Sequence, residues 1–137
     1  NVKDSLDFSF SGLKTAVLRR AEAKGMYPHS DESPLDPQEV ANVAAAFQEA
    51  LVEFMVRRTI EAVKRYGGNA VLLGGGVAAN SRLRQQMTEK SPVPVMVPRP
   101  ALCTDNGAMI GAAAYFHLRH GMRREWDLDV VPNLRLG

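Results

Sequence analysis

The chain has 137 residues, of which 45% are hydrophobic and 23% are charged, and its formal net charge is +2. This length is enough for one domain with a hydrophobic core, and the small charge permits a nucleic-acid partner without arguing for one. The single cysteine excludes an internal disulfide and is typical of a reducing compartment. No signal peptide or membrane-length apolar run is recognisable, so the sequence predicts a cytoplasmic protein with no membrane partner. The chain begins at Asn1 without an initiator methionine, and we expect it to be a piece of a longer protein.

The N-terminal region predicts a strand followed by a helix. Residues 6–11 alternate apolar and polar side chains, which is typical of a strand with one covered face. The helix that follows is predicted to end at Gly25. Lys14 lies in its first turn, where it either reaches a phosphate or is a solvated surface lysine. Residues 26–36 are rich in proline, serine and aspartate and predict a loop.

A long helix is predicted next. Asp36 is a suitable N-cap, Pro37 suits the first helical position and Glu39 stands three residues after the cap. Gly67 is the predicted end of the helix. Its apolar positions keep helical spacing: Val40, Val43, Ala44, Phe47, Leu51, Phe54 and Met55. We interpret this helix as core scaffold and assign it no chemistry.

The most informative stretch is an apolar run that ends in three glycines. Residues 70–73 predict a buried strand, residues 74–76 a glycine turn, and Asn80 or Ser81 the cap of a helix that runs to Lys90. A strand, a glycine turn and a helix N-terminus form a general site for an anion or a nucleotide. The alternative is a tight turn whose glycines serve only close packing, because the run matches neither the dinucleotide fingerprint nor the Walker loop.

The remaining elements are a third strand, a helix and a tail. Residues 93–97 predict a strand whose flanking prolines suit a sheet edge, and a helix is predicted from Ala108 to about His120. Residues 122–137 are irregular and predict a tail, so the folded part is residues 1–121. The last helix is lined by small residues, so we expect something to pack closely against it: Gly107, Gly111, Ala112 and Ala114.

Asp105 precedes this last helix and has two interpretations. It either caps the helix or coordinates a metal ion near bound phosphates. His117 and His120 are three residues apart and could both bind a metal, although a solvated pair near a helix C-terminus is the simpler interpretation. Cys103 is a lone thiol, and such thiols are more often buried than reactive.

Three segments taken together resemble a known family. Residues 9–15, residues 74–80 followed by Leu83 and Arg84, and residues 103–110 resemble the C-terminal part of the bacterial TsaD proteins, also called Gcp, whose relatives include the Kae and OSGEP proteins. The segments occur in the family's order, and residues 40–50 match its long helix. The resemblance covers nearly the whole chain.

The resemblance implies a fold and an activity. The fold would be α/β, an incomplete C-terminal lobe of the actin/Hsp70/sugar-kinase (ASKHA) type in residues 1–121, with about three strands and four helices. The activity would be transfer of the threonylcarbamoyl group from threonylcarbamoyl-AMP to the adenosine beside the tRNA anticodon. Two alternatives stay open: the lobe of an ATP-dependent ASKHA kinase, and a non-catalytic interaction module.

The resemblance also implies site residues. Gly74, Gly75 and Gly76 would hold the nucleotide part of threonylcarbamoyl-AMP or ATP, and Asn80 would hydrogen-bond the substrate. Asp105 would bind one iron or zinc ion, which polarises the carbamoyl carbonyl.

One departure from the family limits what this chain is expected to do alone. The family's metal site also uses two histidines spaced His-x-x-x-His in an N-terminal lobe, and His117 and His120 have the wrong spacing and location. We therefore expect weak metal binding, no catalysis by this chain alone, and a need for the missing N-terminal lobe. The implied partners are TsaB- and TsaE-type proteins and tRNA. Because only three strands are predicted, we also hypothesise a dimer through an open sheet edge.

Overall fold

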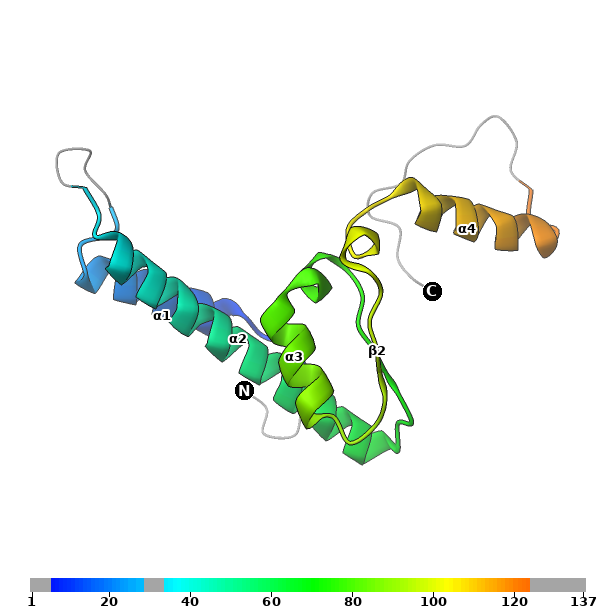
Figure 1. Cartoon of the computed structure of the whole chain (residues 1–137), viewed down its shortest axis with the longest axis horizontal. Coiled ribbons are helices and arrows are strands. Elements are labelled where there is room, and N and C mark those ends of the chain that lie inside the picture. Colours follow the sequence, from blue (N-terminus) through cyan, green and yellow to red (C-terminus); the bar gives the residue numbers. More distant parts are fainter. Residues whose placement is uncertain (1–5, 29–33, 124–137) are drawn as a thin grey trace. The chain divides into compact units, whose positions relative to one another are not determined.

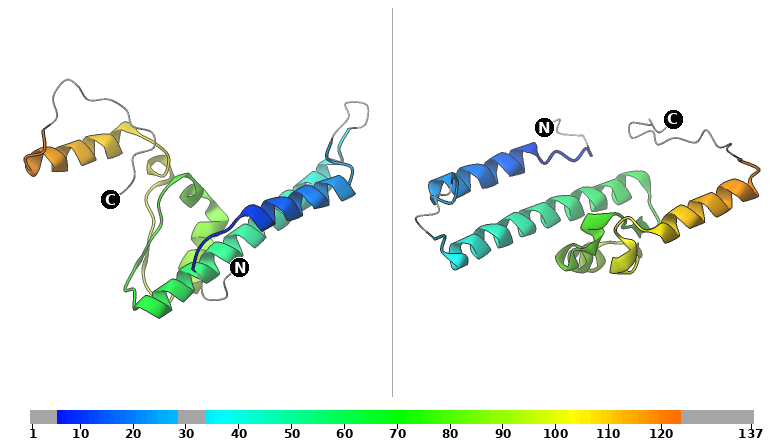
Figure 2. Two further views of the ribbon diagram at one scale, coloured as in Figure 1. Left: turned by 180° about the vertical axis from the view of Figure 1, so that it is seen from behind. Right: turned by 90° about the horizontal axis from the view of Figure 1, so that it is seen from above.

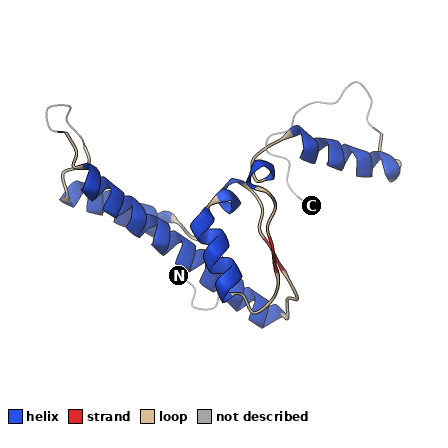
Figure 3. Cartoon of the chain, viewed as in Figure 1, coloured by secondary structure: helices blue, strands red, loops and turns tan. Residues whose placement is uncertain are grey.

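The structure is a computed structural model, and it describes residues 6–28 and 34–123. It divides at Cys103 into two compact units, each described by itself. The elements are short strands between helices (Figures 1 and 3): α1 (Ser11–Ala23), α2 (Pro37–Tyr66), β1 (Val71–Leu72), the 3₁₀ helix η1 (Gly76–Ala79), α3 (Ser81–Lys90), β2 (Val95–Met96), the 3₁₀ helix η2 (Pro100–Leu102) and α4 (Gly107–Arg119). The chain is therefore α/β with four helices, as predicted, but with two strands instead of three among the described residues.

The predicted strand at residues 6–11 is wrong. Residues 6–10 form an irregular segment, and helix α1 already begins at Ser11. The alternating aromatic rings nevertheless face one way: Phe8 and Phe10 each meet Phe54 of α2 edge to face, with ring centroids 5.7 and 6.0 Å apart. A strand requires a neighbouring strand for its backbone hydrogen bonds, and no described strand pairs with this segment. The alternation therefore indicated which side chains share one face, although Phe8 is still 47% exposed, and it predicted the backbone conformation wrongly.

Helix α2 has the bounds that its end signals predict. The Asp36 carboxylate accepts a hydrogen bond from the backbone N–H of Gln38 at 2.9 Å, and Pro37 occupies the first helical position. Gly67 ends the helix in the left-handed conformation, with φ of 64°. Helix α1 lies along the N-terminal half of α2 (Figure 2).

The hydrophobic core lies where the C-terminal half of α2 meets α3 and the sheet. Its buried members come from three elements: Val52 and Val56 of α2, Val71 of β1, and Leu83 and Met87 of α3. Strands β1 and β2 are parallel, with Val71 opposite Val95. Successive strand residues point to opposite faces, so Val71 is 6% exposed whereas Leu72 is 75% exposed.

Helix α4, in the second unit, closely follows its predicted range, and Gly121 with φ of 76° follows its end. Within the described residues of this unit, a Cβ built on Gly107 or Gly111 meets no atom within 4 Å, so the close partner expected from the small residues does not come from this unit. The predicted tail, residues 122–137, lies almost entirely outside the described residues. Within the described ranges, no helix is both long and apolar enough to span a membrane.

Candidate functional site

The candidate site begins at the carboxyl ends of the two parallel strands. Strand β1 leads into the glycine loop, which we define as residues 74–79, and β2 leads into residues 97–103 (Figure 1). Because the strands are parallel, both segments start from the same edge of the sheet. Crevices at this edge are the usual ligand sites of α/β sheets. The topology therefore places the glycine-rich motif where a ligand is expected to bind.

Gly75 is the residue of this loop whose conformation requires glycine. Its φ of 81° and ψ of 171° lie in a region that side-chain-bearing residues avoid. The loop then tightens into η1, where the Ala78 N–H donates to the Gly75 carbonyl at 3.0 Å. A Cβ built on Gly74, Gly75 or Gly76 meets no atom within 4 Å, so close packing among the described residues does not require these glycines. Among the described residues, space for a side chain is therefore not what these glycines provide, and only the backbone conformation of Gly75 requires a glycine.

Asn80, and not Ser81, caps helix α3. Its side-chain carbonyl accepts from the Leu83 N–H at 2.9 Å, and its amide nitrogen donates to Oε1 of Gln48 at 2.9 Å. An asparagine amide has two N–H groups and a carbonyl with two lone pairs, so one donor and one acceptor position are left for a ligand. Asn80 therefore has a structural role, and any test of substrate binding by Asn80 must distinguish that role from contact with the substrate.

Arg84 connects the glycine loop to the segment after β2. Its Nε donates to the Ala78 carbonyl at 2.5 Å, and its Nη2 lies 2.9 Å from the Pro98 carbonyl and 3.1 Å from Sγ of Cys103. Cys103 is buried, as predicted, and is 2% exposed. The sequence analysis identified Arg84 only as part of a motif. Its acceptors on Pro98 and Cys103 belong to a later segment of the chain, and no local sequence pattern predicts such contacts.

A polar network fastens α3 to α2. The guanidinium of Arg82 contacts both carboxylate oxygens of Glu49 at 2.8 Å, and the Gln86 amide also donates to Glu49. Lys90 donates to Oε1 of Gln86 at 2.6 Å. The hydrogen bond from Arg82 lowers the pKa of Glu49 below its usual range. This pair is exposed, so we expect it to orient α3 more than to stabilise it.

A pocket of about 290 Å³ adjoins the glycine loop. Val77, directly after the three glycines, lines it together with Lys14 from the first motif segment. The other lining residues are apolar: Phe10, Leu13, Phe47, Leu51 and Met55. Two of the three motif segments thus meet at one pocket, which is slightly smaller than typical small-molecule sites of about 300–1,000 Å³.

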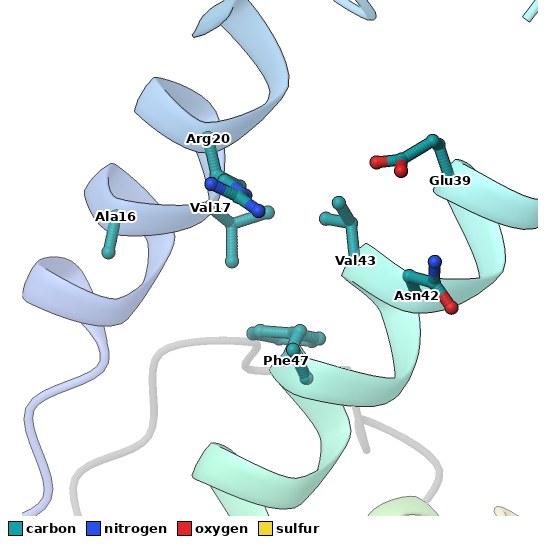
Figure 4. A pocket seen from close by; sticks show the side chains of 8 residues that line it. Ala16, Val17, Arg20, Glu39, Asn42, Val43 and Phe47 are labelled. Atoms are coloured by element: carbon teal, nitrogen blue, oxygen red, sulfur yellow. The ribbon is translucent and has the colours of Figure 1, made fainter. Parts of the chain in front are cut away.

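A second groove, of about 280 Å³, lies between α1 and α2 and away from the glycine loop. Figure 4 shows Val17 and Val43 pointing toward each other across it, with the Phe47 ring between the two helices. Small residues, Ala16 and Ala46, also line it. We attribute the groove to incomplete filling of the space between two helices and assign it no chemistry.

Asp105 lies in the second unit and is exposed. The interpretation that it caps α4 is wrong, because the neighbouring Asn106 accepts the hydrogen bond from the Met109 N–H at 3.0 Å. The described residues contain no group of three or more His, Cys, Asp or Glu side chains that could hold a metal ion. His117 and His120 accordingly belong to no such group.

These observations define an α/β lobe with a glycine loop and an adjoining pocket at the carboxyl edge of a parallel sheet. Residues 1–112 match the family described as "TsaD: tRNA N6-adenosine threonylcarbamoyltransferase". The chain therefore belongs to the TsaD family.

Curated relatives agree with this family. Proteins named tRNA N6-adenosine threonylcarbamoyltransferase from Thermomicrobium roseum and Symbiobacterium thermophilum are 47% and 46% identical over 97% and 96% of this chain. A protein of the same name from Dehalococcoides mccartyi is 43% identical over 97% of the chain. The matches cover 40%, 37% and 37% of these relatives, so the chain spans about two fifths of their length.

Proposed function

We propose that this chain forms the C-terminal part of a tRNA N6-adenosine threonylcarbamoyltransferase of the ASKHA fold. The complete enzyme would transfer the threonylcarbamoyl group from threonylcarbamoyl-AMP to the adenosine beside the tRNA anticodon. The observation that carries the proposal is the pocket at which the glycine loop and the first motif segment of a TsaD family member meet. The kinase alternative is not retained, because the family and its named relatives are tRNA N6-adenosine threonylcarbamoyltransferases.

In this proposal the lobe holds the nucleotide part of threonylcarbamoyl-AMP, or ATP. The apolar pocket beside Val77 suits a planar base, and the exposed loop at residues 74–76 offers backbone N–H groups to the polar part of the ligand. Asn80 has one amide N–H left after its bond to Gln48 and is the proposed hydrogen-bond donor to the substrate. Lys14 on the pocket wall adds a positive charge for a phosphate.

Calorimetric titration of AMP into the chain tests this site. We expect a dissociation constant in the millimolar range, equivalent to about 4 kcal/mol. Asn80→Ala removes both the cap and the donor, whereas Asn80→Ser keeps an oxygen that caps α3 and removes only the amide. Equal weakening in both variants supports ligand contact by Asn80. Unchanged AMP binding by Asn80→Ser would leave Asn80 as a cap only.

Asp105 is proposed as one donor to an iron or zinc ion. A lone carboxylate displaces little of an ion's hydration shell, and the described residues do not complete the set of donors, so we derive no catalytic step through the metal. We expect the chain alone to bind Zn²⁺ weakly and Asp105→Asn to remove that binding in a titration. Tight binding that survives Asp105→Asn would contradict this role.

The proposed partners follow from the same function. They are the remaining part of the longer protein, TsaB- and TsaE-type proteins and tRNA, in the cytoplasm. We expect the chain alone to be inactive in threonylcarbamoyl transfer. A dimer through an edge of the two-stranded sheet is also proposed, and a monomeric mass by light scattering at high concentration would count against it.

A further inference from the structure

We infer that Arg84 is the positioning residue of the glycine loop. It joins the end of that loop to residues 98–103, so that both segments leave the sheet in one fixed arrangement. The contacts that carry the inference are the hydrogen bonds of its guanidinium to the Ala78 and Pro98 carbonyls and its contact with Cys103 Sγ. The inference rests on the proposed function only for its effect on nucleotide binding.

All three partners of Arg84 are neutral. Its contacts are two carbonyls and a thiol, and it forms no ion pair with any described carboxylate. The Ala78 carbonyl lies near the end of η1, where carbonyl groups lack partners within the helix, and Ala78 is 2% exposed. A buried carbonyl without a donor is costly, so the Arg84 bond replaces solvent that Ala78 cannot reach.

The shape of the side chain explains why arginine stands here. A guanidinium carries five N–H donors in a rigid plane and can bridge acceptors on separate segments, whereas a lysine ammonium is a compact point of charge. Arg82 provides the contrast on the same helix. Its guanidinium contacts Glu49 of α2 and Gln85 of α3. The two arginines therefore hold α3 to different neighbours.

Loss of Arg84 has a local consequence. Asn80 would still cap α3, and Leu83 and Met87 would still fill the core, so the helix stays in place. The carbonyl of Ala78 would seek water instead, which requires the loop to open. Cys103 would lose the guanidinium that lies 3.1 Å from its sulfur. We expect both segments to become accessible together.

The test compares Arg84→Met and Arg84→Lys with the matched control Arg82→Met in the 137-residue chain. Three measurements are made on each variant. They are the labelling rate of Cys103 by a thiol reagent in native buffer, the amide hydrogen exchange of residues 74–80, and the free energy of unfolding in urea. Cys103 is the only cysteine of the chain, so labelling reports a single site. Added ethylguanidinium at millimolar concentration tests whether a free guanidinium rescues Arg84→Met.

We expect Arg84→Met to accelerate both labelling and exchange by about tenfold, Arg84→Lys to do so less, and ethylguanidinium to reverse part of the change. Arg82→Met should leave both rates within about twofold. The inference is overturned if both rates in Arg84→Met equal those of the wild type, or if they change only in proportion to the free energy of unfolding in all variants.

AMP titration of the same variants separates this inference from the proposed function. If the wild type binds AMP, Arg84→Met should weaken binding about tenfold and Arg82→Met should not, and equal affinities in all three proteins would overturn the positioning role. If the wild type does not bind AMP, the proposal that the isolated chain binds a nucleotide is contradicted. The labelling and exchange rates then still decide the role of Arg84.

Discussion

The two halves of helix α2 have the same helical backbone and different surroundings. In the C-terminal half, Val52 and Val56 are each 2% exposed and pack against α3 and β1. In the N-terminal half, Val40 is 40% exposed and Phe47 is 37% exposed, although α1 lies alongside. The apolar stripe predicted from the sequence contains neither Val52 nor Val56, so the spacing did not predict which side chains of α2 are buried.

What differs is which elements pack against each half. Two elements, α3 and β1, cover the apolar side chains of the C-terminal half. Along most of the N-terminal half the packing partner is α1, which leaves the groove of Figure 4, and α3 adds only polar contacts to Gln48 and Glu49. A single helix cannot enclose a side chain on all sides, because packing of ridges into grooves covers only a stripe. The comparison predicts that substitutions in the C-terminal half of α2, and in the elements packed against it, lower the free energy of unfolding the most.

The largest effect is expected at Leu83, which is 1% exposed at the centre of the core. Leu83→Ala should lower the free energy of unfolding by about 2–5 kcal/mol, because it removes buried methyl groups and leaves a cavity. Urea denaturation followed by circular dichroism measures the change. A loss below about 1 kcal/mol would show that this core does not stabilise the chain.

A matched pair of valines on α2 tests the comparison directly. Val52→Ala should lower the free energy of unfolding by about 2 kcal/mol, since it removes a buried side chain. Val40→Ala should change it by no more than about 0.5 kcal/mol, because its site is partly solvated. Both variants replace a valine by alanine in the same helix, so the same urea experiment compares the two halves of α2. Equal effects would contradict the difference in burial.

The next effect is expected in the glycine loop. Gly75→Ala places a Cβ on a residue with φ of 81° and should lower the free energy of unfolding by about 1–2 kcal/mol. Gly74→Ala is the control, because Gly74 is not among the glycines with positive φ and a Cβ there meets no atom within 4 Å. We expect the control to lie within about 0.5 kcal/mol of the wild type. Thermal unfolding of both variants shows whether backbone conformation or lack of space for a side chain makes alanine unfavourable in this loop.

The smallest effect is expected at Glu49, where the two halves of α2 meet. Its pKa is lowered in the folded chain because Arg82 hydrogen-bonds to the carboxylate. A lowered folded pKa means that the pair stabilises the fold above the unfolded pKa, about 4.3 for glutamate, and that this contribution is lost as pH falls through the folded value. The urea midpoint of the wild type should therefore fall more steeply than that of Glu49→Gln as pH is lowered from 6 to about 3. Parallel curves would show that the pair has no net effect.

The sequence predicted several local features because their causes lie within a few residues. Asp36 and Gly67 set the ends of α2 through a cap and a left-handed residue, and Asn80 caps α3. The order of the motif segments also indicated the TsaD family, which the family match confirms. The sequence left the cap of α3 open between Asn80 and Ser81, and the structure has Asn80. It offered Asp105 as the cap of α4, whereas the structure has Asn106.

Features that depend on segments far apart in the chain were decided only by the tertiary structure. The alternation of residues 6–10 is compatible with a strand, but a strand forms only where a neighbouring strand completes its hydrogen bonds, and these residues lie against Phe54 instead. The role of Arg84 depends on where the chain returns after β2 and brings Pro98 and Cys103 within reach. The ends of α2 were therefore determined by the sequence itself. Burial and the joining of the two loops required the folded chain, because hydrogen bonds and packing act only over a few ångströms.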